Sequence, residues 1–394
     1  MPSSAFLFIH PLLDTGDSWS AYYAELSPAG AGAGDDILQQ LAVSPWLDDF
    51  DQRHPWLLPA TATPLASGRL GQRAVTTFPA LPSAAESAAL AAEETALRQA
   101  SRPLALATSV DAPLPTTGVW NYLLLTAAHL RSLPPTQRQD LAARSTLVAT
   151  GVSSHADRKW LVDNACALST GEFMLARGPL PGRADTTRLK LLQLLALIAE
   201  DADNPALEAI FRQESKLSYS LLRLVNSAAM ARATPITGFS QAIHLLGRRQ
   251  LQRWLQLLLY ADLNSNDPPN PLLQKAAARG QLMELLALEA EPAPVMENLG
   301  DAAFIVGAFS LLDILLNMPL PEIMRQLPLA QEITAALTEK AGPLGGLLRA
   351  IHAAEMRDLE TAARELDKQG ILPKQFLEAQ LAALSWAVRI RVAP

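Results

Sequence analysis

The chain changes its hydrophobic pattern about halfway along its length. Up to about residue 185, short apolar runs are separated by Pro, Gly, Ser and Thr, and helical patterns lie between several of them. Such runs predict buried strands, and strands alternating with helices predict an α/β layout with a parallel sheet. The predicted strands are Ala5–Ile9, Ala74–Phe78, Leu104–Thr108, Tyr122–Thr126, Thr146–Thr150 and Phe173–Leu175, and the predicted helices are Ser83–Gln99 and Pro135–Ala143.

From about residue 186 onward, the apolar positions recur with the spacing of helices. This pattern predicts an all-α domain of roughly nine or ten helices, with Pro and Gly at the breaks. The predicted helices include Leu189–Ala199, Leu272–Ala290, Ala302–Asn317, Leu329–Lys340, Pro343–Met356, Asp358–Lys368 and Pro373–Arg391. We therefore expect an α/β domain over residues 1–187 and an all-α domain over residues 188–394, joined by the linker Ala176–Thr186.

Composition narrows the class of protein. The chain has 394 residues, of which 49% are hydrophobic and 18% charged, so it is globular rather than disordered. Its formal net charge of −7 argues against a protein that coats nucleic acid. The single cysteine, Cys166, permits no internal disulfide and is expected to be a small buried hydrophobe, as suits a cytoplasmic protein.

No membrane segment is predicted. The first residues, MPSSAFLFIHPLLD, lack the basic region of a signal peptide. The most apolar stretch runs from Ala302 to Leu320, but Asp313 interrupts it near its middle. A charge at the centre of a membrane span is costly, so we expect a buried core helix there.

The stretch from Ser218 to Leu259 carries the most distinctive pattern in the chain. Two apolar helical runs flank a connector that contains Pro and Gly, and a basic cluster with a tryptophan follows. Asn226 interrupts an apolar helical face, and we expect its amide to bond the connector backbone because buried polar groups need partners. The residues that mark this pattern are Asn226, Ser227, Pro235, Gly247 and Trp254, and the basic cluster is Arg248, Arg249 and Arg253.

The basic cluster admits two interpretations. The first is a solvated helix face whose arginine stems pack over the core. The second is a contact for an anion or an acidic partner, whereas no recognition motif accompanies the cluster to favour nucleic acid.

This stretch resembles the signature region of the HDOD domain, a bacterial signalling module related to HD phosphohydrolases but without their metal ligands. The resemblance lies in Leu222–Ala228, Pro235-Ile236, Gln241–Ile243, Leu245–Gly247 and Arg253-Trp254. None of the six histidines is followed by Asp, and Ser310 and Leu311 stand about where the His-Asp pair of an HD enzyme would be. These residue types cannot bind a divalent cation there.

An α/β region before an HDOD domain resembles the EAL–HDOD proteins, whose EAL domains are barrel-shaped phosphodiesterases that cleave cyclic di-GMP. The similar segments are Phe8–Leu12, Tyr23–Leu26, Leu104–Thr108, Leu147–Val152 and Gly171–Met174 followed by Pro179. The family's metal-binding residues are replaced near Ala107-Thr108, by Thr150 and by Thr170, and Glu25 alone cannot hold two cations. Because a full barrel usually needs about 250 residues, we expect an eroded, incomplete barrel.

The resemblance implies a non-catalytic bacterial signal-transduction or scaffold protein that binds other signalling proteins in cyclic di-GMP-linked regulation. It implies no catalytic residue, no metal, no cofactor, and neither membrane nor nucleic acid as partner. One alternative is a non-hydrolysing cyclic di-GMP receptor. A second is a residual phosphodiesterase or HD-type phosphohydrolase.

Overall fold

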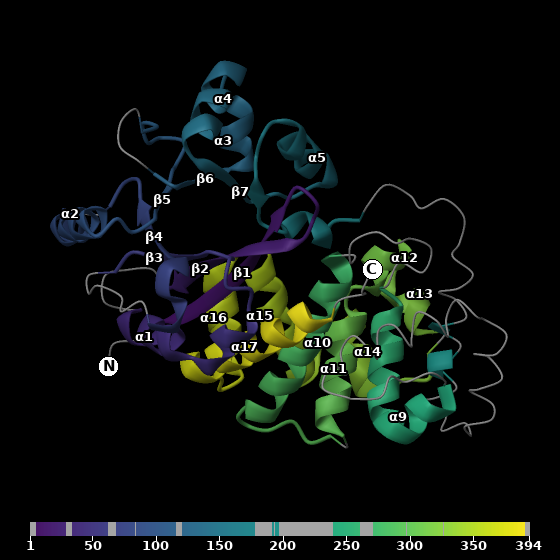
Figure 1. The fold of residues 1–394 in the computed structure, drawn as a ribbon. Coiled ribbons are helices and arrows are strands. Elements are labelled where there is room, and N and C mark those ends of the chain that lie inside the picture. Colours follow the sequence, from purple (N-terminus) through teal and green to yellow (C-terminus); the bar gives the residue numbers. More distant parts are fainter. Residues whose placement is uncertain are drawn as a thin grey trace. The chain divides into compact units, whose positions relative to one another are not determined.

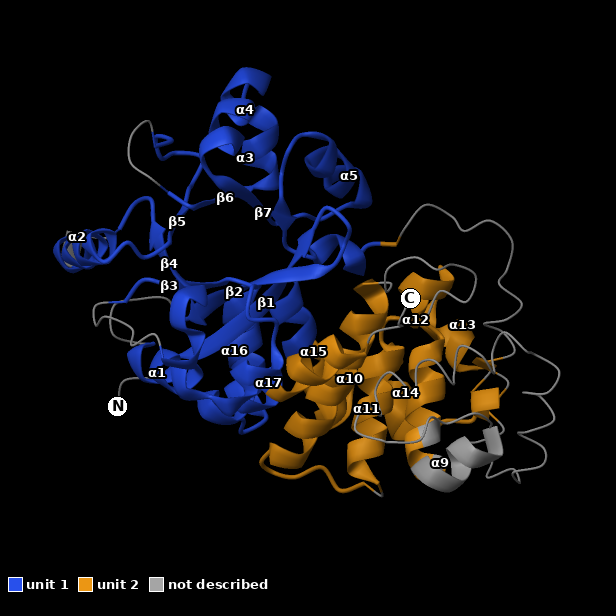
Figure 2. Cartoon of the chain, viewed as in Figure 1, with its two compact units in different colours: residues 1–176, 350–381 blue, residues 177–349, 382–394 orange. Residues whose placement is uncertain are grey.

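The computed structural model describes most of the chain, namely residues 5–28, 34–61, 68–82, 84–115, 120–177, 191–192, 194–196, 239–260, 271–296, 298–325 and 327–390. The chain divides into two compact units, coloured separately in Figure 2. Unit 1 combines Met1–Ala176 with Ala350–Leu381, and unit 2 combines Arg177–Arg349 with Ala382–Pro394. The predicted boundary between residues 187 and 188 stays a prediction.

Unit 1 contains a closed barrel of eight strands that follow one another in chain order (Figure 1). The strands are β1 (Phe6–Asp14), β2 (Trp19–Ser27), β3 (Trp56–Pro59), β4 (Ala74–Pro79), β5 (Leu104–Ala107), β6 (Tyr122–Thr126), β7 (Thr146–Thr150) and β8 (Leu168–Ser169). β1 runs antiparallel to both of its neighbours, β2 and β8. All other neighbouring strands are parallel.

The barrel closes around a core of small and medium side chains. Its members come from every strand of the ring and include Tyr23 and partly buried Tyr122; the others are Leu12, Ala21, Leu57, Val75, Ala105, Ala107, Leu124, Val148 and Leu168. Strands as short as two residues suffice to close the ring. The expected barrel class is confirmed. The expectation of an incomplete ring is wrong, because all eight strands are present, although some of them are short.

Helices and short 3-10 turns connect the strands, and the helices lie outside the ring in Figure 1. Thr126 and Ser154 begin two of the helices with side-chain oxygens that accept backbone N–H groups, as N-caps do. The helices are α1 (Asp35–Val43), α2 (Ala84–Gln99), α3 (Ala127–Ser132), α4 (Pro135–Arg144) and α5 (His155–Asp163). The 3-10 turns are η1 (Pro45–Asp49), η2 (Gly68–Arg73) and η3 (Glu172–Leu175), so the predicted strand Phe173–Leu175 is wrong.

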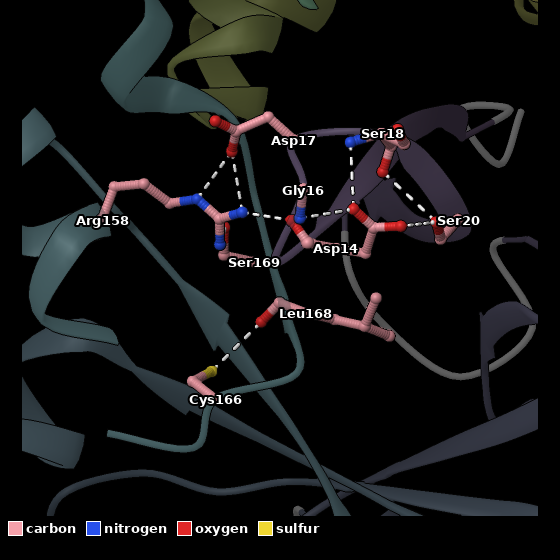
Figure 3. Close-up of polar contacts among 9 residues, drawn as sticks. All are labelled: Asp14, Gly16, Asp17, Ser18, Ser20, Arg158, Cys166, Leu168 and Ser169. Carbon is pink, nitrogen blue, oxygen red and sulfur yellow. Dashed lines mark hydrogen bonds and ion pairs between the residues drawn. The ribbon is translucent and has the colours of Figure 1, made fainter. Parts of the chain in front are cut away.

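A polar network holds the β1–β2 hairpin to the last strand (Figure 3). Arg158 of α5 donates to the Asp17 carboxylate over 2.9 and 2.8 Å, to the Ser169 hydroxyl over 3.1 Å, and to the carbonyl oxygen of Asp14. The Asp14 carboxylate in turn accepts the amides of Gly16 and Ser18 and the hydroxyl of Ser20. The network therefore shapes the hairpin turn and joins it to β8.

Unit 2 is helical over its described residues. α10 (Pro271–Glu289) and α11 (Leu299–Phe309) pack so closely that a Cβ on Gly307 would lie 2.6 Å from the carbonyl oxygen of Arg279. The other helices of the C-terminal half are α9 (Phe239–Leu258), α12 (Leu312–Leu316), α13 (Leu320–Met324), α14 (Gln331–Thr338), α15 (Gly342–Glu355), α16 (Leu359–Lys368) and α17 (Pro373–Arg389). The predicted single helix Ala302–Asn317 is broken between α11 and α12.

The most apolar helical stretch of the described residues is Leu299–Leu316, with a mean hydropathy of 1.9. It is long and apolar enough to cross a membrane by length and composition, but 61% of it is buried inside the structure. This degree of burial is typical of a core helix, which is what we expected from the charge of Asp313 within the stretch.

The segment 350–381 belongs to the barrel unit although it follows the helical region in sequence. The ring of Phe376 on α17 lies 5.1 Å from the ring of Phe8 and 6.0 Å from that of Phe6, between ring centres. The side chain of Gln380 accepts the backbone N–H of Ile9 over 3.0 Å. β1 is therefore anchored by residues from the end of the chain.

Candidate functional site

The carboxyl ends of the parallel strands are where barrel enzymes carry their active sites. β2 runs parallel to β3, so Glu25 near the end of β2 lies at this edge together with the ends of the later strands. The polar residues at or just beyond these ends are Glu25, Thr108, Thr126, Thr150, Thr170 and Glu172. This edge is the candidate site.

Glu25 is held by an arginine from the C-terminal segment of unit 1. Arg357, between α15 and α16, donates from Nε to Glu25 Oε2 over 2.8 Å and from Nη2 to Oε1 over 2.7 Å. This two-bond arrangement is the strong, directional form of an arginine–carboxylate pair. The side chains are 22% and 18% exposed, so the pair is largely withdrawn from water.

Two more polar side chains of β1 and β2 contact Glu25. Tyr23 donates its hydroxyl to Glu25 Oε1 over 3.2 Å, and His10 Nε2 lies 3.5 Å from Oε2. His10 pairs with Tyr23 in the β1–β2 register, so the three side chains share one face of the pair. Arg357 also lies over the Tyr23 ring, 5.6 Å from its centre.

Glu172 is the second carboxylate of the site. It begins η3, its side chain is only 4% exposed, and Arg357 Nη1 lies 3.9 Å from its Oε1. Neither of its carboxylate oxygens has a hydrogen-bond partner among the described residues. Arg357 therefore hydrogen-bonds the Glu25 carboxylate directly, whereas it interacts with the Glu172 carboxylate only through their opposite charges.

Burial and the arginine oppose each other in setting the protonation of the site. Burial alone would raise the pKa of Glu25, but the hydrogen bonds and charge of Arg357 outweigh it, and the pKa is lowered. Burial followed by the Glu25 charge raises the pKa of the Tyr23 hydroxyl. Burial alone would lower the pKa of Arg357, but the hydrogen bonds and charge of Glu25 outweigh burial, and the pKa is raised. The pair is thus a stable ion pair at neutral pH.

The strand-end donors do not fit the two-metal site that the EAL resemblance implies. Thr108 donates its hydroxyl to the Leu124 carbonyl over 3.0 Å, and Thr150 and Thr170 reach backbone carbonyls over 3.5 Å. Divalent cations in such sites prefer carboxylate ligands, and Glu25 is already committed to Arg357. Among the described residues, no group of three His, Cys, Asp or Glu could hold a metal ion.

The predicted basic cluster forms an ion-pair network in unit 2. Arg253 is 12% exposed and pairs with Glu284 at 2.6 Å and Asp301 at 3.0 Å, while its guanidinium lies 4.9 Å from the centre of the Phe304 ring. Arg249 also pairs with Asp301, at 2.5 Å, but its side chain is 61% exposed. The side chain of Arg248 lies outside the described residues. Of the two arginines placed here, only Arg249 faces solvent.

The described signature residues have structural roles. Trp254 is buried, with its ring 6.0 Å from that of Trp386. Gly247 has φ of 74° and interrupts the helical span α9, as its predicted position at a helix end suggests. Asn226, Ser227 and Pro235 lie outside the described residues, so the predicted amide contact of Asn226 stays a prediction.

Ser310, which by sequence stands about where an HD enzyme would carry its His-Asp pair, is bonded to an arginine of α10. Ser310 ends α11 and accepts a hydrogen bond from Arg279 Nη1 over 2.7 Å, while its own hydroxyl donates to the Gly307 carbonyl. Arg279 is buried. The Ser310 hydroxyl therefore links α10 to the end of α11.

Sequence reasoning identified Glu25 but missed Arg357 and Glu172. Arg357 is 332 positions from Glu25, in a stretch that reads as an ordinary break between helices. Glu172 was part of the Gly171–Met174 segment quoted for the resemblance, yet no pattern indicated its burial. A composition or spacing rule would not have joined these three residues.

Comparison with known proteins identifies the second region. Residues 186–292 match the family model described as the HDOD domain. A stretch of 171 residues is 33% identical to a cyclic di-GMP phosphodiesterase, CdgJ of Vibrio cholerae, covering 43% of this chain and 36% of that protein. The uncharacterized protein YuxH of Bacillus subtilis is 26% identical over 247 residues, covering 61% of this chain and 58% of that protein. The chain thus spans less than two thirds of either relative.

Solved structures with some likeness include Klebsiella pneumoniae BlrP1 in complex with calcium and cyclic di-GMP, with 15% identity and a TM-score of 0.32 over 43% of this chain and 55% of that one. A phosphohydrolase-like protein from Shewanella amazonensis has 14% identity and a TM-score of 0.33 over 51% of this chain and 93% of that one. Scores this low support no argument. The predicted resemblance to EAL–HDOD proteins is confirmed by the HDOD match, the closed barrel and the curated relative.

Proposed function

We propose that this chain is a non-catalytic signal-transduction protein of cyclic di-GMP-linked regulation that acts in the cytoplasm by binding other signalling proteins. It would need neither a metal nor a cofactor, and neither membrane nor nucleic acid would be its partner. The link to cyclic di-GMP draws on the name of the Vibrio cholerae relative, which is a phosphodiesterase. Hydrolysis is therefore the alternative that an experiment must address.

The Arg357–Glu25 pair is the observation that carries the proposal. Metal-assisted cleavage of a phosphodiester needs carboxylates that are free to hold the ions and activate water. Glu25, at the end of β2, instead accepts two hydrogen bonds of 2.8 and 2.7 Å from a guanidinium. The hydroxyls at the ends of β5 and β7 are directed to backbone carbonyls. These contacts support a barrel that serves as a scaffold.

For protein binding, the exposed basic residue Arg249 is the candidate contact for an acidic partner. Its side chain is 61% exposed while it pairs with Asp301. Arg253, at 12% exposure, would act behind it by holding Asp301 and Glu284 in place. Contacts of this kind at an interface rim chiefly steer and orient a charged partner.

The test is incubation of the full chain with cyclic di-GMP and Mg²⁺ or Mn²⁺, followed by chromatography of the nucleotide. We expect no linear product under conditions in which an active cyclic di-GMP phosphodiesterase, run in parallel, converts all of its substrate. Hydrolysis that Glu25→Gln abolishes would refute the non-catalytic function and assign the activity to this site. Titration calorimetry with cyclic di-GMP should give no micromolar binding; binding without hydrolysis would favour the receptor alternative.

A further inference from the structure

We propose that Arg279, Lys340 and Arg349 form a site in unit 2 that binds a small dianion of the phosphate type. Arg279 lies on α10, Lys340 directly follows the end of α14, and Arg349 lies on α15. All three belong to unit 2, whereas the residues of the barrel-edge site belong to unit 1. The proposal goes beyond the proposed function, because neither binding of a signalling protein nor loss of hydrolysis requires it.

Hydrogen bonds hold the two guanidinium groups of the cluster in place. Arg349 donates from Nη1 to the carbonyl oxygen of Lys340, which ties α15 to the residue that follows α14. Lys340 has φ of 53°, a left-handed conformation that ends a helix and turns the chain. Arg279 is only 3% exposed, and its Nη1 donates to the Ser310 hydroxyl over 2.7 Å. Both guanidinium groups are therefore positioned without a ligand.

Positive charge outweighs negative charge around the Lys340 ammonium. Burial, followed by the like charges of Arg279 and Arg349, lowers the pKa of Lys340, and the opposite charge of Asp313 counters this only in part. Asp313 is also shared, because Arg177 Nη2 lies 3.7 Å from its Oδ2. The lysine, the two arginines and this one carboxylate together carry two net positive charges. A bound dianion would balance them.

The donors and their exposure suit a small oxyanion that enters from solvent. Guanidinium groups bind phosphate through paired N–H donors, and a lysine adds a point charge on a flexible stem. Arg279 is buried, Lys340 is half-buried and Arg349 is exposed. The cluster thus extends from the helical core to the surface, so an anion could reach it and lose water on one side.

The test is titration calorimetry of the full chain with inorganic phosphate at low ionic strength and slightly alkaline pH, where phosphate is chiefly a dianion. Sodium chloride at equal ionic strength is the control for general screening. The variants are Lys340→Gln, Arg349→Gln and Asp313→Asn. Lys159→Gln is the matched control, because its ammonium on α5 is 80% exposed and belongs to unit 1. A nucleoside 5′-monophosphate is titrated in parallel.

We expect the parent to bind one phosphate per chain, and its melting temperature should rise with phosphate concentration. Lys340→Gln and Arg349→Gln should each weaken binding at least about fivefold, because one positive charge close to the anion is lost. Asp313→Asn should tighten binding about fivefold, because the opposing charge is removed. Lys159→Gln should bind like the parent. Tighter binding of the nucleotide than of phosphate would identify a phosphate ester as the ligand, and equal binding would identify the free ion.

Three results would overturn the proposal. They are no binding up to about 10 mM phosphate, an equal rise in melting temperature with sodium chloride, and unchanged binding in Lys340→Gln and Arg349→Gln. If one of these two variants does not fold, the other decides, and weaker binding by Asp313→Asn would also contradict the charge argument. None of these results bears on cyclic di-GMP, so hydrolysis of that nucleotide would refute the proposed function and leave this inference standing.

Discussion

Arg158 offers the sharpest test of how the barrel is held closed. Its side chain is 5% exposed, and it donates to groups on both sides of the β1–β8 junction (Figure 3). Arg158→Ala removes every one of these hydrogen bonds at once. A matched control is Arg144→Ala, because Arg144 is 48% exposed and pairs with Asp140, four residues earlier on its own helix.

The expected loss of folding stability depends on whether each acceptor can find another hydrogen-bond donor when the arginine is removed. Asp17 is 43% exposed, so water can replace the guanidinium and little is lost there. The Asp14 carbonyl loses the arginine but keeps the N–H of Asp17, 2.9 Å away, whereas the hydroxyl of fully buried Ser169 loses its arginine donor. At about 1–3 kcal/mol for one buried group that loses its partner, Arg158→Ala should lower the free energy of unfolding by roughly 1–3 kcal/mol. Arg144→Ala should cost less than about 0.5 kcal/mol.

The assay is urea unfolding followed by tryptophan fluorescence, combined with hydrogen exchange resolved by mass spectrometry. Hydrogen exchange is needed because a chain with two compact units need not unfold in one step. Faster exchange should concentrate in β1, β2 and β8 of the Arg158→Ala variant. A loss below about 1 kcal/mol, or equal losses in the two variants, would refute the view that this network closes the barrel.

Two further predictions concern a buried acid and a close helix contact. Burial, followed by the charge of Asp35, raises the pKa of Glu93 from 4.5 to about 7, so the folded chain holds this proton more tightly and stability falls as the pH rises through that window. In Glu93→Gln, stability measured by thermal melts should depend less on pH, and above about pH 7 the variant should be more stable than the parent by roughly 2–3 kcal/mol. An unchanged dependence of stability on pH would contradict the raised pKa of Glu93. Gly307→Ala would place a Cβ 2.6 Å from the Arg279 carbonyl oxygen and 2.7 Å from Gly280 Cα, so it should lower stability by about 1–3 kcal/mol. A gain in melting temperature, as an ordinary helical Gly→Ala change would give, would show that α10 and α11 are not in close contact.

Most of the strands could be predicted because they are short apolar runs between turn residues. β1 and β4–β7 fall within or around the predicted segments. β2, with the sequence WSAYYAELS, was missed because alanine, serine and glutamate dilute its apolar pattern. β3 and β8 have four and two residues, too few for a period to be detected. These short strands are stabilised by pairing with their neighbours in the closed barrel, and the local sequence does not indicate that pairing.

The candidate site was only half predictable for a different reason. Glu25 was named because the segment Tyr23–Leu26 resembles the Glu-Ala-Leu position of EAL domains. Arg357 carries no comparable mark, since a buried, paired arginine and a solvated one look alike in a helical sequence. Its pairing depends on a long-range return of the chain, which local pattern does not encode.

The return of residues 350–381 to the barrel unit has a consequence for biosynthesis. About 170 residues separate Ala176 from Ala350, and they leave the ribosome before the barrel unit is complete. At about 5–20 residues per second, this interval is roughly 9–35 s. During that time β1 lacks Phe376 and Gln380, and Glu25 and Glu172 lack their guanidinium. The nascent barrel therefore lacks these contacts until residues 350–381 have been translated.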